Sequence, residues 1–402
     1  MIEKIKTIFL YIDGMRYDYI KRMPFLNDYA NHYFNCPVDI EPLHQFEFSI
    51  FTSQHQYSHN LWSWYALAAD IDESPFSWLR YIHRYIPNGP KTRNLITYIN
   101  AGLQLLKKQT RFVKIGSIPY EVALQLTTTA KKSFIDHRPT CVKTMFDVLH
   151  EYDWNFFLIE WPICSTNKRI YLNPLLRKSS NMFSELKKKK DKDFVFAHFV
   201  ELDNKMHSYG IDTAQVYREL SNLDNGLENY IEFLEREIKD YNLIICSDHG
   251  MAKTVGTINV ASILQNKRFL AFPDSTTLRL WCNSLDDIEL GCELLEELPN
   301  GHVYGKDDFA EIGITYSRRF TGDLMFISDI GYIITPNYFD GENIPKAMHG
   351  FLPSKELEAC FVINTRNIND VNRIEMVDIC PTTLESMNIP IPSNWQGKSH
   401  IC

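Results

Sequence analysis

The chain has 402 residues, of which 45% are hydrophobic and 23% charged, and its formal net charge at pH 7 is −8. This composition is ordinary for a soluble globular protein and provides enough apolar material for one large core with smaller inserted parts. The negative charge argues against a general nucleic-acid-binding surface, which is normally basic. No apolar segment reaches the roughly 18 residues that a membrane span needs.

The nine cysteines are scattered, odd in number and never spaced as Cys-x-x-Cys. This usage excludes both a disulfide framework and a zinc-ribbon pattern. The apolar start at Ile8–Ile12 is too short for a signal peptide and is followed by a charged segment. We therefore expect a reduced, cytoplasmic protein, whose oligomeric state the sequence leaves open.

Four short apolar runs, rich in β-branched and aromatic residues, are separated by several spacers with a helical pattern. Such runs are typical of parallel strands buried on both faces of a sheet. The clearest helical spacer is Thr213–Asp240, with leucine and isoleucine at helical spacing. This alternation predicts an α/β fold with a doubly wound, mostly parallel central sheet and helices on both faces. The expected strands are Thr7–Ile12, Phe156–Glu160, Phe194–Val200 and Leu243–Cys246.

Two stretches do not follow the core pattern and are expected to be inserted cap segments over the site. We assign residues 1–61, 144–269 and 344–402 to a metal-binding core, 62–143 to a helical cap and 270–343 to an α+β cap. The patterned pieces within the caps are helix-like Leu95–Lys108, strand-like Thr277–Trp281, Leu324–Ile327 and Tyr332–Ile334, and an acidic helix around Asp286–Glu297.

Three of the expected strands lead directly into potential metal ligands. The first strand runs into Asp13, the third is followed by Asp203, and the fourth by the adjacent pair Asp248 and His249. Ligand sites in open α/β sheets gather at the carboxyl ends of the strands. We therefore expect these separate segments to meet at one edge of the sheet.

Further features of these residues indicate a metal centre. His207 lies four residues after Asp203, so a helix would place both on one face, and His349 provides a sixth ligand. Carboxylate oxygen and imidazole nitrogen are both accepted by hard or borderline metals. A single structural ion needs about four ligands, whereas two ions about 4 Å apart can clamp a phosphoryl group. The set thus predicts two ions and phosphoester chemistry.

In this order, these residues resemble the alkaline phosphatase superfamily, nearest to its nucleotide pyrophosphatase/phosphodiesterase branch. The resemblance spans most of the chain, except the two insertions. Its motifs are the opening Asp13-Gly14-Met15-Arg16-Tyr17-Asp18, then Asp203-x-x-x-His207, Ser247-Asp248-His249-Gly250-Met251, His349-Gly350, and the closing Val377-Asp378-Ile379-Cys380-Pro381.

The resemblance implies a division of the six ligands between two divalent ions, usually zinc in the family, with manganese or magnesium as alternatives. One ion would be held by Asp203, His207 and His349. The other, beside the nucleophile, would be held by Asp13, Asp248 and His249.

The nucleophile is where the sequence departs from the family. The family places a threonine or serine nine residues before a Thr-Gly pair, at a helix N-terminus that favours an anionic oxygen. Here Thr52-Ser53 corresponds to that pair, and nine residues earlier lies Leu43, which cannot attack phosphorus. Three alternatives remain open: Ser49 or Thr52 attacks, His44 attacks or assists because imidazole forms phosphoryl intermediates, or a metal-bound hydroxide attacks directly.

The leading hypothesis is a two-metal-dependent hydrolase of phosphodiester or pyrophosphate bonds in a small phosphorylated, nucleotide-like substrate. One alternative is a phosphotransferase that moves a phospho-head group to a sugar acceptor. The other is a catalytically silent protein that binds a phosphate ligand but lacks the usual threonine or serine nucleophile.

Overall fold

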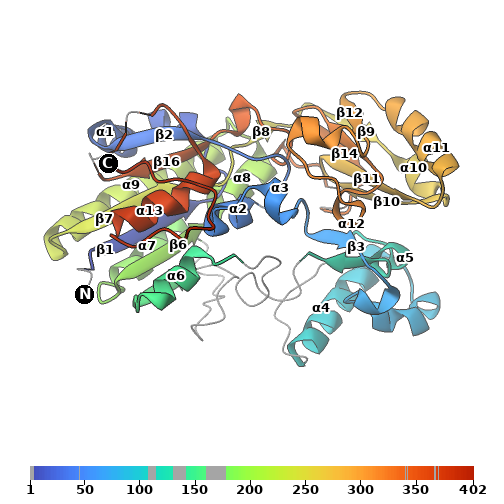
Figure 1. Cartoon of the computed structure of the whole chain (residues 1–402), viewed down its shortest axis with the longest axis horizontal. Helices are drawn as coiled ribbons and strands as arrows, with labels where there is room; N and C mark the ends of the chain where they lie inside the picture. Colours follow the sequence, from blue (N-terminus) through green and yellow to red (C-terminus); the bar gives the residue numbers. More distant parts are fainter. Residues whose placement is uncertain are drawn as a thin grey trace.

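The structure is a computed structural model that describes residues 4–44, 46–106, 115–129, 142–159, 178–339, 341, 343–365, 368–369 and 371–402. A seven-stranded sheet lies at one end of the molecule and a four-stranded sheet at the other (Figure 1). Between them lie the helices α2 (Phe46–Thr52), α3 (Gln56–His59) and α8 (Glu201–Tyr209) (Figure 1).

The large sheet confirms the predicted fold class. Strands β5, β6, β1 and β7 are parallel to one another, and only β16 runs antiparallel to its neighbours β7 and β2. All four expected strands are present in it, and Glu160 lies outside the described residues. In spatial order the strands are β17 (Ile374–Glu375), β2 (Phe34–Asp39), β16 (Ala359–Ile363), β7 (Tyr241–Cys246), β1 (Lys6–Ile12), β6 (Phe194–Phe199) and β5 (Phe156–Ile159).

The central strand β1 is buried on both faces. Its successive side chains point to opposite sides of the sheet, and each side is covered by its own apolar cluster. Phe9 and Tyr11 belong to one apolar cluster, and Ile8, Leu10 and Ile12 to the other. Helices α2, α6 (Met145–Glu151) and α13 (Ile379–Ser386) cover the first face, and α1 (Pro24–His32), α7 (Ser179–Lys187), α8 and α9 (Ala214–Glu237) the second.

Helix α9 confirms the strongest helical pattern in the sequence. Thr213 caps its start by accepting a hydrogen bond from the backbone N–H of Val216. Its buried face includes Leu220, Leu223 and Leu227, which pack in the second cluster.

The second unit is an antiparallel sheet that contains two of the strand-like pieces expected in residues 270–343, Thr277–Trp281 and Leu324–Ile327. Its order is β10 (Phe269–Asp274), β11 (Thr277–Cys282), β13 (Leu324–Ser328) and β12 (Gly301–Tyr304). The acidic helix is α11 (Leu285–Glu296), which packs on this sheet; the other helices of the region are α10 (Ala261–Gln265) and α12 (Arg318–Thr321), which lies beside β3 (Tyr65–Leu67). Strand β14 (Tyr332–Thr335) pairs with β9 (Gly256–Asn259), so this unit also recruits residues before 270. The exact boundaries of the core and caps stay a prediction.

The first insertion contributes the predicted long helix, which is α4 (Pro90–Leu106), and a small hairpin-like pair. The helical residues Lys107 and Lys108 of the prediction lie outside the described residues. The remaining elements are β3 (Tyr65–Leu67), β4 (Leu126–Thr128), α5 (Tyr120–Ala123), β8 (Ala252–Lys253), β15 (Ala347–Met348) and the 3₁₀ turns η1 (Tyr17–Arg22), η2 (Ile71–Glu73), η3 (Ser77–Tyr81), η4 (His83–Tyr85), η6 (Phe309–Ile312), η7 (Lys355–Leu357) and η8 (Met376–Asp378). Within the described part of the chain, no helix combines the length and the apolar character needed to cross a membrane.

Candidate metal centre and active site

Asp13 lies at the carboxyl end of β1, where the chain turns sharply at Gly14. Gly14 has a φ of +72°, and a Cβ atom there would lie 2.9 Å from Cε of Met206. Its backbone N–H donates to Oδ1 of Asp248 over 3.2 Å. The positive φ favours glycine at this position, and the absence of a side chain leaves room for Asp203 and Met206 of α8. The turn places the two carboxylates of neighbouring strands side by side.

His198 also contacts Asp13, although it belongs to none of the motifs in the sequence. It lies on β6 opposite Tyr11 of β1, and its Nε2 is 3.0 Å from Oδ2 of Asp13. Its only signal in the sequence is that of an imidazole within the otherwise apolar run Phe194–Val200. A histidine buried in such a run needs a polar partner, which Asp13 provides.

Asp248 and His249 follow β7 and complete the first group. Nδ1 of His249 is 2.7 Å from the carbonyl oxygen of Gly250, a contact in which Nδ1–H donates. Its Nε2 then faces Oδ1 of Asp13 at 3.4 Å and Oδ2 of Asp248 at 3.3 Å. Ligand atoms of Asp13, Asp248 and His249 all lie within 4.8 Å of one another. The structure thus brings together the three residues that the family resemblance assigns to one ion.

Asp203 and His207 lie one turn apart on α8, as their spacing predicts. Nε2 of His207 is 3.3 Å from Oδ1 of Asp203. Nδ1 of His207 is 2.8 Å from the carbonyl oxygen of Ala347, which fixes the ring orientation. This hydrogen bond leaves Nε2 directed at the carboxylate, the arrangement found around metal-bound histidines.

His349 joins the cluster through a short antiparallel ladder. Strand β15 pairs with β8, which begins three residues after His249, and this pairing brings His349 back beside it. The two rings are stacked, with centroids 3.6 Å apart and an interplanar angle of 10°. Ligand atoms of Asp203, His249 and His349 lie within 4.8 Å of one another, and the His207 and His349 ring centroids are 5.3 Å apart. His249 therefore borders both groups, whereas the sequence assigned it to one.

The first group has strongly shifted acidities. Burial opposes ionisation of Asp13, but hydrogen bonds from His198 and His249 hold its pKa below the usual range. Burial and the neighbouring Asp13 raise the pKa of Asp248 to about 7. For His249, burial is outweighed by Asp248 and Asp13, which raise its pKa to about 10. Two buried carboxylates this close need a shared positive charge, from protons or from a cation.

The nearby imidazoles of the second group differ in their surroundings. Burial opposes protonation of His207, but Asp203 raises its pKa above the ordinary value. Burial and the neighbouring imidazoles of His249, His44 and His207 lower the pKa of His349. Burial likewise lowers the pKa of His44. The cluster thus contains an imidazole whose pKa is raised by a carboxylate, His207, and two whose pKa values are lowered by burial, His349 and His44.

The nucleophile candidates are placed differently from one another. His44 packs against the cluster, with its ring centroid 5.2 Å from that of His349. Leu43 instead lies in an apolar cluster with Trp62 and Met325. The hydroxyl of Thr52 donates to the carbonyl oxygen of Phe48 over 2.6 Å, within its own helix.

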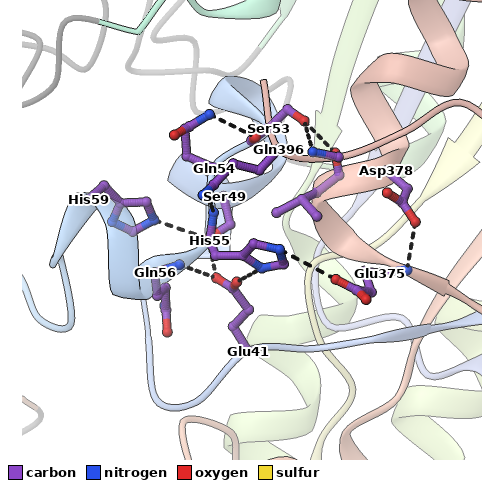
Figure 2. Close-up of polar contacts among 12 residues, drawn as sticks. Glu41, Ser49, Ser53, Gln54, His55, Gln56, His59, Glu375, Asp378 and Gln396 are labelled. Atoms are coloured by element: carbon purple, nitrogen blue, oxygen red, sulfur yellow. Dashed lines mark hydrogen bonds and ion pairs between the residues drawn. The ribbon is translucent and has the colours of Figure 1, made fainter. Parts of the chain in front are cut away.

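Ser49 belongs to a separate polar network centred on Glu41 (Figure 2). Its hydroxyl donates to Glu41, and Nε2 of His59 lies 3.1 Å away. Nδ1 of His59 accepts the backbone N–H of Leu61, so Nε2–H donates to the serine oxygen. A histidine that donates to a serine cannot remove its proton. His59 therefore does not serve Ser49 as a base, and the hydroxyl proton of Ser49 is directed at the Glu41 carboxylate rather than at either ligand group.

Comparison with known proteins identifies the family. A sequence model described as type I phosphodiesterase/nucleotide pyrophosphatase matches residues 110–352, which is more than half of the chain. The chain belongs to this family. Asp13 precedes the matched region of the type I phosphodiesterase/nucleotide pyrophosphatase model, and the other five predicted ligands lie within it. The predicted resemblance is confirmed.

Solved structures of the family share the fold over nearly the whole chain. Murine ectonucleotide pyrophosphatase/phosphodiesterase 5 is 15% identical, with a TM-score of 0.64 over 97% of this chain and 97% of that one. An inactive form of the murine protein in complex with AMP matches with the same identity and TM-score. The human protein is 16% identical, with a TM-score of 0.65 over 97% of this chain and 96% of its own. A sequence comparison with curated proteins gives no match.

Proposed function

We propose that this chain is a two-metal-dependent hydrolase of phosphodiester or pyrophosphate bonds, acting on a small nucleotide-like substrate. The observation that carries the proposal is the convergence of two carboxylate–imidazole groups that both include His249. Their residues come from the carboxyl ends of β1, β6 and β7 and from the β15 ladder. Family membership supports the reaction class.

The residues fit divalent ions by their donor chemistry. In His207 and His249, Nδ1 is engaged by a backbone carbonyl, so Nε2 is the available donor and faces carboxylate oxygen. Nδ1 of His349 is buried without a hydrogen-bond partner among the described residues, and Oδ1 of Asp203 faces Nε2 of His207 at 3.3 Å. Unsatisfied buried polar atoms of this kind are costly unless a ligand engages them. We assign one ion to Asp13, Asp248 and His249, and one to Asp203, His207 and His349.

Two divalent ions would neutralise charge that develops on the phosphoryl oxygens and on the leaving oxygen. Zinc is the first expectation from this mixed nitrogen and oxygen ligand set, and manganese or magnesium the second. The protein's own contribution is to hold the ligands in place. His198 orients Asp13, the carbonyl of Ala347 orients His207, and Gly14 lets α8 approach β1.

The test is hydrolysis of an aryl phosphodiester and of a nucleotide aryl diester by the purified chain, loaded separately with zinc, manganese and magnesium. We expect turnover of the diesters and its loss on chelation, with recovery when the ion is restored. No turnover of mono- or diesters with any of these ions would overturn the proposal.

A second candidate, a silent phosphate-binding protein, is favoured by one observation. The position that corresponds to the family nucleophile is Leu43, whose side chain is buried in an apolar cluster. This candidate predicts tight, metal-dependent binding of AMP without cleavage of any diester. The same metal-loaded preparations distinguish the two functions by measuring binding and turnover in parallel.

A further inference from the structure

His44 reaches the metal-ligand cluster through an unusual backbone turn at the preceding residue. Leu43 has a φ of 66°, which is uncommon for a leucine and costs about 1–2 kcal/mol. The Leu43 side chain fills an apolar cluster, whereas the His44 ring packs edge-on against His349 at an interplanar angle of 83°. Local strain of this kind is retained where the surrounding structure needs the resulting side-chain placement.

His44 is held through both its ring and its backbone. Gly350 has a φ of +83°, and a Cβ atom there would lie 2.0 Å from Cε1 and 2.3 Å from Nε2 of His44. Only glycine leaves room for the ring at this position. The backbone of His44 is also held, because its carbonyl oxygen accepts a hydrogen bond from Nε2 of Gln56 over 2.5 Å. The imidazole is thus fixed next to a proposed metal ligand.

Despite this close packing, Nε2 of His44 has no hydrogen-bond partner among the described residues and is buried. Leaving a buried polar atom unpaired costs about 1–3 kcal/mol. Such atoms call for a specific reason, and a catalytic role is one of them. This nitrogen therefore lies beside His349 with no hydrogen-bond partner for its lone pair among the described residues.

The two hydroxyl candidates lack this freedom. The Ser49 oxygen donates to Glu41 and accepts from His59 (Figure 2), so both of these contacts are with residues outside the two ligand groups. The Thr52 hydroxyl donates to a carbonyl one turn earlier in α2. Among the residues that the sequence offered as nucleophiles, His44 alone combines a free atom with contact to the cluster.

Resting on the proposed diester hydrolysis, we propose that Nε2 of His44 attacks phosphorus and that the reaction passes through a phosphohistidine. The lone pair of Nε2 forms a P–N bond while the P–O bond to the leaving alcohol breaks and its oxygen keeps the electron pair. That oxygen is then protonated by water. In the second step water attacks phosphorus, the P–N bond returns its electron pair to the imidazole, and one proton is released. The sum is diester plus water giving monoester plus alcohol.

The decisive experiment is the stereochemical course of hydrolysis of a chiral phosphorothioate diester in ¹⁸O-labelled water by the metal-loaded chain. Two successive displacements through His44 give retention of configuration at phosphorus. A single attack by water gives inversion and overturns the inference, while the observed turnover leaves the proposed function standing. Absence of turnover by the wild-type chain overturns the function and the inference together.

Trapping the covalent intermediate identifies the residue that attacks phosphorus. An alkaline quench during turnover of a ³²P-labelled diester preserves phosphohistidine, which acid removes. We expect acid-labile label on the peptide that contains His44 and none in His44→Asn. Label on a serine or threonine peptide, or no label with retained turnover, overturns the inference.

Variants separate a nucleophile from a structural or ligand role. We expect His44→Asn to lose at least about 10³-fold in kcat while its metal content and melting temperature stay close to wild type. In His44→Ala, added imidazole should restore turnover in proportion to its concentration. The matched control is His302→Gln, which removes an exposed histidine and should keep full activity. Loss of one ion from His44→Asn would make His44 a ligand and overturn the inference.

Discussion

The imidazole rings of His249 and His349 lie stacked, with centroids 3.6 Å apart and planes 10° from parallel. These residues follow different strands and are about 100 positions apart in the sequence, and the ladder between β8 and β15 brings them together. Because His249 lies within ligand distance of both groups, the stack joins them into one centre. This shared position leads to the first prediction.

We expect His249→Gln to weaken binding of both ions, whereas His207→Gln weakens binding of one. The reason is that ligand atoms of His249 lie in both groups, whereas His207 lies beside Asp203 and His349 of the second group. Metal content after dialysis against a defined free zinc concentration measures both effects. Equal loss in the two variants would show that the groups bind independently of the stack.

His198 should act by orienting Asp13, since its Nε2 is 3.0 Å from that carboxylate. We expect His198→Phe to weaken the affinity for one ion by about 10- to 100-fold, as removal of outer-shell partners does. His198→Gln keeps a hydrogen-bonding group and should lose less. Calorimetric zinc titration measures both affinities, and an unchanged affinity in His198→Phe would remove His198 from the centre.

Leu43→Thr restores the residue type of the family nucleophile and should nevertheless give no gain in turnover. The side chain at this position packs with Trp62 and Met325, so threonine would leave a cavity and bury a hydroxyl. We expect the free energy of unfolding to fall by about 2–4 kcal/mol. Denaturant unfolding and diester kinetics measure the two outcomes. A faster, stable Leu43→Thr variant would mean that position 43 faces the substrate.

His55 gives a prediction of pH dependence outside the metal centre. Its ring lies 2.8 Å from Glu41 and 3.5 Å from Glu375, stacks on Tyr57, and has Asp378 nearby. The hydrogen bond to Glu41 raises the pKa of His55 although burial opposes it. A raised folded-state pKa stabilises the fold fully below the unfolded value of about 6.5, and this contribution is lost as pH rises through the folded pKa.

The stability difference between wild type and His55→Gln should therefore shrink as the pH rises above about 6.5. Urea unfolding of both chains across this range measures it, with His302→Gln as the control for loss of an exposed histidine. A difference that stays constant with pH would show that the Glu41 contact does not stabilise protonated His55.

The sequence predicted the architecture well because its main strands are buried on both faces and so read as continuous apolar runs. Thr7–Ile12 and Leu243–Cys246 fall almost entirely within β1 and β7 for that reason. Strand β2 carries a proline and four partly exposed positions, so its pattern is weaker. The sheet edge formed by β2 and β17 depends on pairing with distant residues, which local pattern does not encode.

The metal ligands could also be predicted from the sequence, since Asp13, Asp248 and His249 follow closely after strands. His198 was not, because a lone imidazole inside a strand has no motif, and only the register between β6 and β1 places it on Asp13. The orientation of His44 depends on a positive φ at Leu43, a backbone angle that a leucine does not signal. The placement of both His198 and His44 therefore depends on tertiary contacts, which the local sequence does not encode.

The central claim, two divalent ions in one shared centre, is tested most directly by anomalous diffraction at the zinc absorption edge from crystals grown with zinc. The account predicts two anomalous peaks, one beside Asp13, Asp248 and His249 and one beside Asp203, His207 and His349. A single peak, or peaks away from these side chains, would contradict it.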